Sequence, residues 1–492
     1  MTDLATPGLA PAAVQGGDRR LGFTTMEEEV RVDSVDVDGT LPDWLTGRLI
    51  RVTPALLDYE TATSTKTVGH WFDGLAMLNC FTIGSGNVSY ASRFVQSRDY
   101  TAIREQKINR QPLTFGTDPC RVLGRRVMAM FDGQPSDNAH INVAKVGERY
   151  VTLTEMPLPM EFDPETLGTR GLVKFDPDVH GQMGPYGHPH FDRNGAMICY
   201  LASIGPKSSY RLLSWEPGAT SRSEIARIPF RGAPRYQHSV AMTERYIILT
   251  AQPLFMQFPT ILRTGKISDG LRWDPRQATE FIVVDRATRQ VVGKYEGEPF
   301  FFFHHANAFD DGDDIVIDVV AMNDATSIWS LEIAKLRDPE HKPRFYGELR
   351  RYRVSRSTGA VTVSTLSDAR LEFPRINYGM VNGRDYRYVY GTAYRTPDSS
   401  WFDELVKVDV TTGAVQRWSE DGCFPGEPVY VRQPGTDGED TGVVISVVLD
   451  TRVGKSFLVV LDASTLSELG RAHAPHHIGF NFHGDFFPSP PS

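Results

Sequence analysis

The stretch "EFIVVDRATRQVVGKYEG" (residues 280–297) decides the fold class. A β-branched run ends at an aspartate, a short polar turn follows, and a second strand-like run begins, which is the pattern of a β-hairpin. Hairpins of the same kind follow at residues 348–366, 404–418 and 456–472. Because an isolated hairpin is unstable and needs neighbouring strands, this repetition predicts an all-β protein.

The spacing of these hairpins favours a β-propeller. Their turn centres, near residues 286, 357, 411 and 463, are roughly 50–70 residues apart, which is about one four-stranded blade with its loops. Long helical periodicity is nearly absent, and residues 326–338 are the best short helical candidate. We expect one propeller of six to eight blades over residues 21–492, with a pair of β-sandwiches as the alternative. Further strands are expected at 149–156, 196–205, 245–254, 314–322 and 442–450.

Composition excludes several classes of function. The net charge of −9 gives no reason to expect a nucleic-acid partner. The four cysteines are scattered without a CxxC pair, which is typical of a reduced, cytoplasmic protein. No apolar run is long enough for a transmembrane helix. Residues 1–20 lack the pattern of a signal peptide and are predicted to be a disordered leader.

Four of the thirteen histidines lie at or just before strand-like runs, in aromatic or apolar surroundings. A single buried histidine is usually an ordinary core residue, but four in such settings are harder to explain. Their separations place them on different blades, whose innermost strands converge on the propeller axis. They are His188 in "YGHPHFDRNG", His238 in "RYQHSVAMTERYIIL", His304 in "FFFFHHANAFDDGDDI" (300–315) and His483 in "IGFNFHGDFF".

A metal ion would explain these histidines. A neutral imidazole gives one nitrogen to the metal and its other N–H to a carboxylate. Glu155, Glu372 and Glu427 stand in equally apolar settings and are candidate carboxylates, although each could equally be a surface residue of a strand.

Eight blocks of the sequence resemble, in order, the signature blocks of the carotenoid cleavage oxygenase family. The resemblance runs from about residue 25 to the C-terminus, and its wording is closest to the animal-type β-carotene oxygenase and retinoid isomerase branch. The blocks are "HWFDGLAML" (70–78), "TEMPLPMEFDPETLGT" (154–169), "GHPHFDRNG", "QHSVAMTERYIIL", "FHHANAFDDGDDIVID", "LEFPRIN", "GEPVYV" and "FHGDFF".

The resemblance implies a seven-bladed propeller with a cap of loops and short helices over an axial metal site. One Fe(II) per chain would be held by His188, His238, His304 and His483, while Glu155, Glu372 and Glu427 would orient three of the imidazoles. Thr154 matches a position whose methyl group crowds an open site on the iron. His190 and His305 would be neighbours of the ligands and not ligands themselves.

The activity that the resemblance implies is cleavage of a conjugated C=C bond of a carotenoid or apocarotenoid by O₂, giving two carbonyl (aldehyde) products, with a retinal-type aldehyde as a candidate product. Inside the family, the alternatives are cleavage of a stilbenoid or phenylpropene and isomerisation of a retinoid ester. A dinuclear zinc hydrolase would also use an HxHxD motif, but Arg193 stands where its next histidine should be, and His304 and His483 would have no role. A metal-free scaffold explains the fold but not the histidines, and four imidazoles suit zinc as well as iron.

An apolar substrate raises the question of membrane access. The segment "AQPLFMQFPTILRTGK" (251–266) is rich in large apolar residues and ends with Arg263 and Lys266. We expect an exposed patch that dips into the membrane surface without crossing it, so that a cytoplasmic protein is peripherally attached; a loop buried over the propeller is the alternative. The patch residues are Leu254, Phe255, Met256, Phe258, Ile261 and Leu262.

Overall fold

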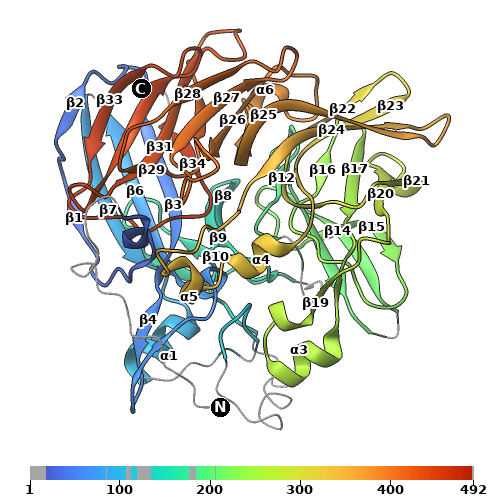
Figure 1. Ribbon diagram of the computed structural model, residues 1–492, viewed down its shortest axis with the longest axis horizontal. Helices are drawn as coiled ribbons and strands as arrows, with labels where there is room; N and C mark the ends of the chain where they lie inside the picture. Colours follow the sequence, from blue (N-terminus) through green and yellow to red (C-terminus); the bar gives the residue numbers. More distant parts are fainter. Residues whose placement is uncertain are drawn as a thin grey trace.

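The computed structural model describes residues 18–84, 86–106, 111, 113–118, 135–176, 184, 186–205 and 207–489. The sheets in these residues form a ring in which the C-terminal strands lie beside the N-terminal ones (Figure 1). The expected all-β propeller is therefore confirmed. All four hairpins predicted from the sequence are antiparallel pairs in the structure.

The first four blades, in sheet order, have the following strands. The first contains β1 (Arg31–Val32), β7 (Asn87–Phe94), β6 (Leu75–Gly84), β3 (Gly47–Leu56) and β34 (Gly484–Pro488), and the second β11 (Thr169–Leu172), β10 (Met160–Phe162), β9 (Arg149–Leu153) and β8 (Asn142–Val146). The third contains β12 (His190–Phe191), β13 (Met197–Ser203), β14 (Ser209–Trp215) and β15 (Ser223–Pro229), and the fourth β16 (Ala241–Met242), β17 (Tyr246–Ala251), β20 (Thr279–Asp285) and β21 (Gln290–Gly297).

A continuous seven-stranded sheet supplies two further blades, joined by its long strand β25. It contains β22 (Phe301–Asp311), β23 (Asp314–Met322), β24 (Gly347–Ser355), β25 (Val361–Arg375), β26 (Tyr388–Ala393), β27 (Glu404–Asp409) and β28 (Val415–Trp418). The last blade contains β2 (Val37–Gly39), β33 (Glu468–His473), β32 (Lys455–Asp462), β31 (Gly442–Asp450) and β29 (Cys423–Pro425), with β30 (Val429–Arg432) paired to β31. This gives the seven blades that the resemblance implied.

The ring is closed by strands from the two ends of the chain. β34 pairs with β3 over five residues, and β2 pairs with β33 over three. These pairings combine early and late segments within single sheets, so closure leaves few unpaired strand edges.

Short helices and two small hairpins form the cap. The helices are η2 (Arg19–Phe23), η3 (Trp71–Asp73), α1 (Arg98–Gln106), α3 (Phe258–Thr264), η4 (Ser268–Gly270), α4 (Thr326–Ser330) and α5 (Ile333–Leu336), and the hairpins are β4 (Asp58–Glu60) with β5 (Thr65–Thr67) and β18 (Leu254–Met256) with β19 (Leu271–Trp273). A further short helix, α6 (Tyr378–Val381), lies apart from the cap and packs against β25 and β26. The expected helix at 326–338 is present as α4 and α5. Helices α1 and α3 lie at the same side of the ring (Figure 1).

The phenylalanine run before His304 is buried on both faces of its strand. Phe300 and Phe302 pack in the core between β17, β20 and β23, whereas Phe301 and Phe303 pack in the cap core. The pairing of β22 with β23 shifts register between Phe302 and His305. Bulges of this kind re-aim side chains beside functional sites, so the run fixes the strand and the bulge sets the direction of His304.

Two expectations are wrong in part. The leader was expected to reach residue 20, but Arg19 is buried and donates hydrogen bonds to the carbonyl oxygens of Asp338 and His341; residues 1–17 lie outside the described part of the chain. The exposed apolar patch is wrong for Leu254, Met256 and Ile261, because hairpin β18–β19 and helix α3 turn these side chains into the cap core.

Phe255, Phe258 and Leu262 are half-buried and are what is left of the expected patch. Among the described residues, no helix is long and apolar enough to cross a membrane.

Candidate metal centre

The four singled-out histidines lie at the inner ends of four different sheets. His304 is within β22, His188 and His238 come just before β12 and β16, and His483 comes directly before β34. Each of these strands is a terminal strand of its sheet or blade. The propeller therefore brings together residues that are far apart in the sequence.

Three of the rings form a cluster that could hold a metal ion. One nitrogen from each of His188, His304 and His483 lies within 4.8 Å of the others. The fourth ring, His238, is outside that group of atoms, but its centroid is 4.3 Å from that of His188 and 5.1 Å from that of His304. The Nε2 atoms of His188 and His304 are buried and have no hydrogen-bond partner. Buried polar atoms are rarely left unpaired, so these nitrogens are suited to a metal.

Glu155 lies beside His238. Its Oε1 is 3.0 Å from Nδ1 of the imidazole, and it also accepts a hydrogen bond of 2.9 Å from the hydroxyl of Tyr236. Tyr236 did not stand out in the sequence, and only its position two residues before His238 could have pointed to it.

Glu372 lies beside His304, with its Oε2 2.6 Å from Nδ1 of the imidazole. The same oxygen accepts the backbone N–H of Phe373, whereas Oε1 is buried without a partner. Phe373 has a φ of 53° and lies within a register shift of β25 against β26, between Glu372 and Arg375. This unusual backbone turns the glutamate of an ordinary strand toward the axis.

Glu427 lies beside His483, with its Oε1 2.7 Å from Nδ1 of the imidazole. The buried Arg51 donates to Oε2 of Glu427 at 2.6 Å, and to the side chain of Asn481 and the carbonyl oxygen of Phe482. Arg51 therefore holds both the carboxylate and the chain segment that carries the imidazole. Each of the three glutamates expected to orient an imidazole therefore contacts a different one of the four histidines.

Burial lowers the pKa of three of these histidines and so favours their neutral form. It lowers the pKa of His188 well below the ordinary value, where the neighbouring histidines act in the same direction. Burial also lowers the pKa of His238 and brings that of His483 to about 4, against the opposing effect of their glutamates. For Glu427, burial alone would raise the pKa, but His483 and the arginines lower it overall. Neutral imidazoles with anionic partners are the form that binds metal.

The two neighbouring histidines have other partners. His190 contacts the hydroxyl of Tyr378 and the carbonyl oxygen of Val240, at 3.0 and 2.9 Å. His305 contacts the hydroxyls of Ser239 and Thr250, at 2.8 and 2.9 Å. Both rings therefore have structural roles.

The last residue of the HxHxD motif has a structural role as well. Asp192 accepts the backbone N–H groups of Asn194 and Ala196 in a turn. A metal-binding role of the kind found in hydrolases is not supported for this aspartate.

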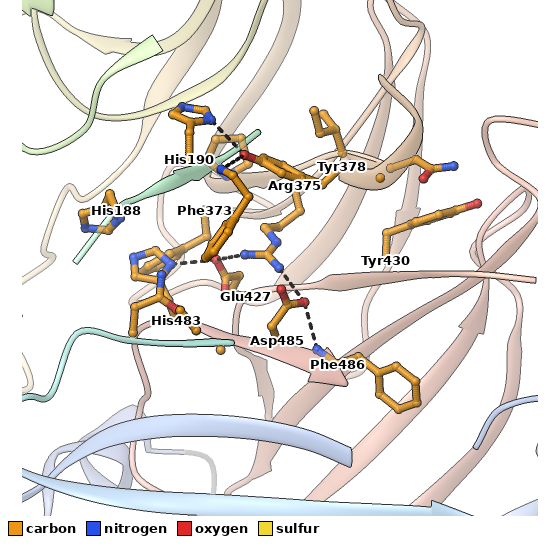
Figure 2. Close-up of a pocket in the computed structure, with 18 of the residues that line it drawn as sticks. His188, His190, Phe373, Arg375, Tyr378, Glu427, Tyr430, His483, Asp485 and Phe486 are labelled. Atoms are coloured by element: carbon orange, nitrogen blue, oxygen red, sulfur yellow. Dashed lines mark hydrogen bonds and ion pairs between the residues drawn. The ribbon is translucent and has the colours of Figure 1, made fainter. Parts of the chain in front are cut away.

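One cavity reaches the cluster and a second lies beside it, bordered by Glu155; in the described residues the two share no lining side chain. The larger, about 580 Å³, is lined by His188, His304 and His483 together with both polar and apolar residues. Figure 2 shows Arg375, Glu427 and Asp485 in this lining, with Phe373 and Phe486 near them. The smaller, about 140 Å³, is lined by Phe72, Ile141 and the cap, and includes Thr154 and Glu155. Thr154 is buried there, and its expected role beside an open metal site stays a prediction.

Comparison with known proteins gives one consistent picture. The model of the retinal pigment epithelial membrane protein (RPE65) family matches residues 23–488. The mitochondrial carotenoid-cleaving dioxygenase of Macaca fascicularis is 33% identical, covering 95% of this chain and 94% of its own length. The β,β-carotene 15,15'-dioxygenase of Rattus norvegicus is 30% identical, covering 94% and 90%. The crystal structure of cobalt-substituted Synechocystis ACO has a TM-score of 0.83 at 24% identity, covering 98% of this chain and 99% of that one.

Proposed function

The chain belongs to the RPE65 family, and we propose that it is an Fe(II)-dependent dioxygenase that cleaves a conjugated C=C bond of a carotenoid or apocarotenoid into two carbonyl products. The expected resemblance to carotenoid cleavage oxygenases is confirmed by this match and by the names of the relatives. The proposal rests on the histidine cluster, in which buried imidazole nitrogens have no hydrogen-bond partner. A glutamate lies beside the imidazole ring of three of the four histidines.

We assign His188, His238, His304 and His483 as the ligands of one Fe(II). The donor set fits, because four neutral imidazoles whose N–H groups face carboxylates or the protein interior are good ligands for a divalent transition metal. When bound, iron supplies the redox chemistry by which O₂ adds to the alkene.

The protein itself contributes position and exclusion of water. On the side of the smaller cavity, the rings of Phe303 and Phe72 lie 4.9 and 6.3 Å from that of His238. These apolar walls suit a polyene and keep bulk water from the reaction. The mechanism requires no side-chain nucleophile or general base, so the outer glutamates hold the imidazoles and do not transfer protons to the substrate.

The proposal extends to the product, the location and the membrane contact of this protein. A retinal-type product fits the 15,15'-dioxygenase among the relatives. The sequence favours a cytoplasmic protein, whereas the macaque relative is named mitochondrial. Membrane contact is proposed for the half-buried Phe255, Phe258 and Leu262, since a water-insoluble substrate must be collected from a bilayer or a carrier.

The test compares ligand and neighbour histidines. His304→Ala should abolish cleavage and lower the iron content, whereas His305→Ala and His190→Ala should keep iron. Products would be analysed after incubating iron-loaded protein with β-carotene, an apocarotenal and resveratrol. Full iron retention in folded His304→Ala would refute the ligand assignment, and cleavage of resveratrol alone would make the substrate a stilbenoid.

A further inference from the structure

The larger cavity connects the histidine cluster with the solvent. Its inner end is formed by His188, His304 and His483, and its outer residues include Tyr378 and Gly379, which are exposed. Charged and polar side chains lie between the two ends, and Arg375 lies in the middle of the cavity (Figure 2).

The smaller cavity offers no comparable path to an ion. Its two carboxylates are already engaged within the protein: Asp73 accepts the N–H groups of Phe115, Gly116 and Thr117, and Glu155 is paired as described above. The buried Nε2 of His140 is the one nitrogen of this lining, among the described residues, that is recorded without a partner. Phe72 covers His238 from this side. A hydrated divalent cation loses a very large hydration energy in apolar surroundings, so it needs a passage that keeps it in contact with water and polar groups.

We propose that the larger cavity is the passage through which the metal ion enters and leaves, and that the side chain of Arg375 is its gate. This inference rests on the proposed metal centre and adds a route and a gating residue to it. The smaller cavity is left to the apolar reactants, so metal exchange and substrate binding use separate sides of the cluster.

The contacts of Arg375 suit a gate. One guanidinium nitrogen is 3.6 Å from Oε1 of Glu427, which orients His483, and another is 3.2 Å from Oδ1 of Asp485. Asp485 is half-exposed, so Arg375 spans from the metal centre to the solvent side. Glu427 keeps its ion pair with Arg51 when Arg375 moves away. A guanidinium is always charged, and its positive charge in the passage repels a divalent cation in both directions.

The experiment follows metal exchange and needs no substrate. The full chain is stripped with a chelator, and the rate of cobalt(II) uptake is read from visible absorption; the rate of loss is read after adding excess chelator. Arg375→Met should speed both rates by about tenfold, since charges in a cleft change association rates by ten- to a thousandfold. The affinity should change less than either rate, because uptake and loss move together.

A second variant narrows the mouth of the passage. A Cβ atom added at Gly379 would meet no neighbouring atom within 4 Å, and the residue is exposed, so Gly379→Phe should fold normally and slow both rates. Arg395→Met, which removes an arginine outside the cavity, and Phe72→Ala, which opens the smaller cavity, are the controls and should leave both rates unchanged. Unchanged rates in folded Arg375→Met and Gly379→Phe would overturn the proposal, as would faster exchange in Phe72→Ala alone. A native chain that takes up no cobalt would instead refute the metal centre itself.

Discussion

Replacing Glu427 by glutamine separates the metal-binding role of this residue from its structural role. Glu427 is 2% exposed, and its two oxygens face different partners: Oε1 lies 2.7 Å from His483, and Oε2 lies 2.6 Å from Arg51. Glutamine keeps the size of the side chain but removes the charge. Arg51, itself 1% exposed, then has lost its closest counter-charge.

Two effects of different size follow. Removing one partner of a buried ion pair typically costs about 3–5 kcal/mol in the free energy of unfolding. Removing the carboxylate behind a metal-binding imidazole costs about 10–100-fold in metal affinity, which is about 1.4–2.7 kcal/mol. We therefore expect Glu427→Gln to be strongly destabilised and to bind metal more weakly.

The double variant Arg51→Met/Glu427→Gln distinguishes the two effects. The double variant removes the unpaired charge of Arg51, so most of the lost free energy of unfolding should be recovered. Apolar replacements of buried ion pairs often leave the stability unchanged. Metal affinity should stay low, since His483 still faces no carboxylate. Urea unfolding of the metal-free protein measures the free energy of unfolding, and competition with a metal chelator measures the metal affinity. Native metal affinity in either variant would refute the reasoning.

Three further predictions concern pH, membrane contact and the other glutamates. Burial lowers the pKa of His483 to about 4 from an ordinary value of 6.5, so between these pH values the unfolded chain binds a proton that the folded chain does not bind. The free energy of unfolding of the metal-free protein should therefore fall as the pH falls from 6.5 toward 4. Urea unfolding at several pH values would measure this. Phe255→Asp with Leu262→Asp should weaken co-sedimentation with liposomes but not cleavage of a detergent-solubilised substrate, because each apolar side chain buried in lipid contributes about 1.5–3 kcal/mol; unchanged liposome binding would exclude the patch. Glu372→Gln should lower metal affinity more than Glu155→Gln in chelator competition, and the reverse order would contradict the contacts.

The fold and the histidines were predictable because their signals are local. A hairpin needs two short β-branched runs and a turn, and all of these lie within about twenty residues, as at 280–297. The histidines carried a second signal, since each stands in an apolar setting that is costly without a partner. Their order along the chain then matched a known family.

The partners of the glutamates could not be predicted, because they come from distant segments. Arg51 and Glu427 are 376 positions apart in sequence and meet only when β3 pairs with β34 at ring closure. The burial of Leu254, Met256 and Ile261 was missed for the same reason. Their apolar pattern is the same for a membrane patch and for a cap core, and only the packing of the cap decides between them.

The three glutamates are not equivalent, because their carboxylates interact with different groups. The carboxylate of Glu427 interacts with His483 and with two arginines. Glu155 accepts a hydrogen bond from the neutral hydroxyl of Tyr236 and is partly exposed to solvent, which screens it.

The carboxylate of Glu372 has no cationic side chain that competes with its histidine, among the described residues. It is fully buried, no arginine or lysine among the described residues forms an ion pair with it, and its Oε1 has no hydrogen-bond partner. Its Oε2 lies 2.6 Å from His304, which is the shortest of the three Glu–His contacts. A hydrogen bond to an unscreened carboxylate in a low-dielectric interior is strong, and it makes the imidazole a better donor to the metal. Of the four proposed ligands, His304 is therefore the one whose loss we expect to lower metal affinity most, and the four buried phenylalanines before it fix its strand.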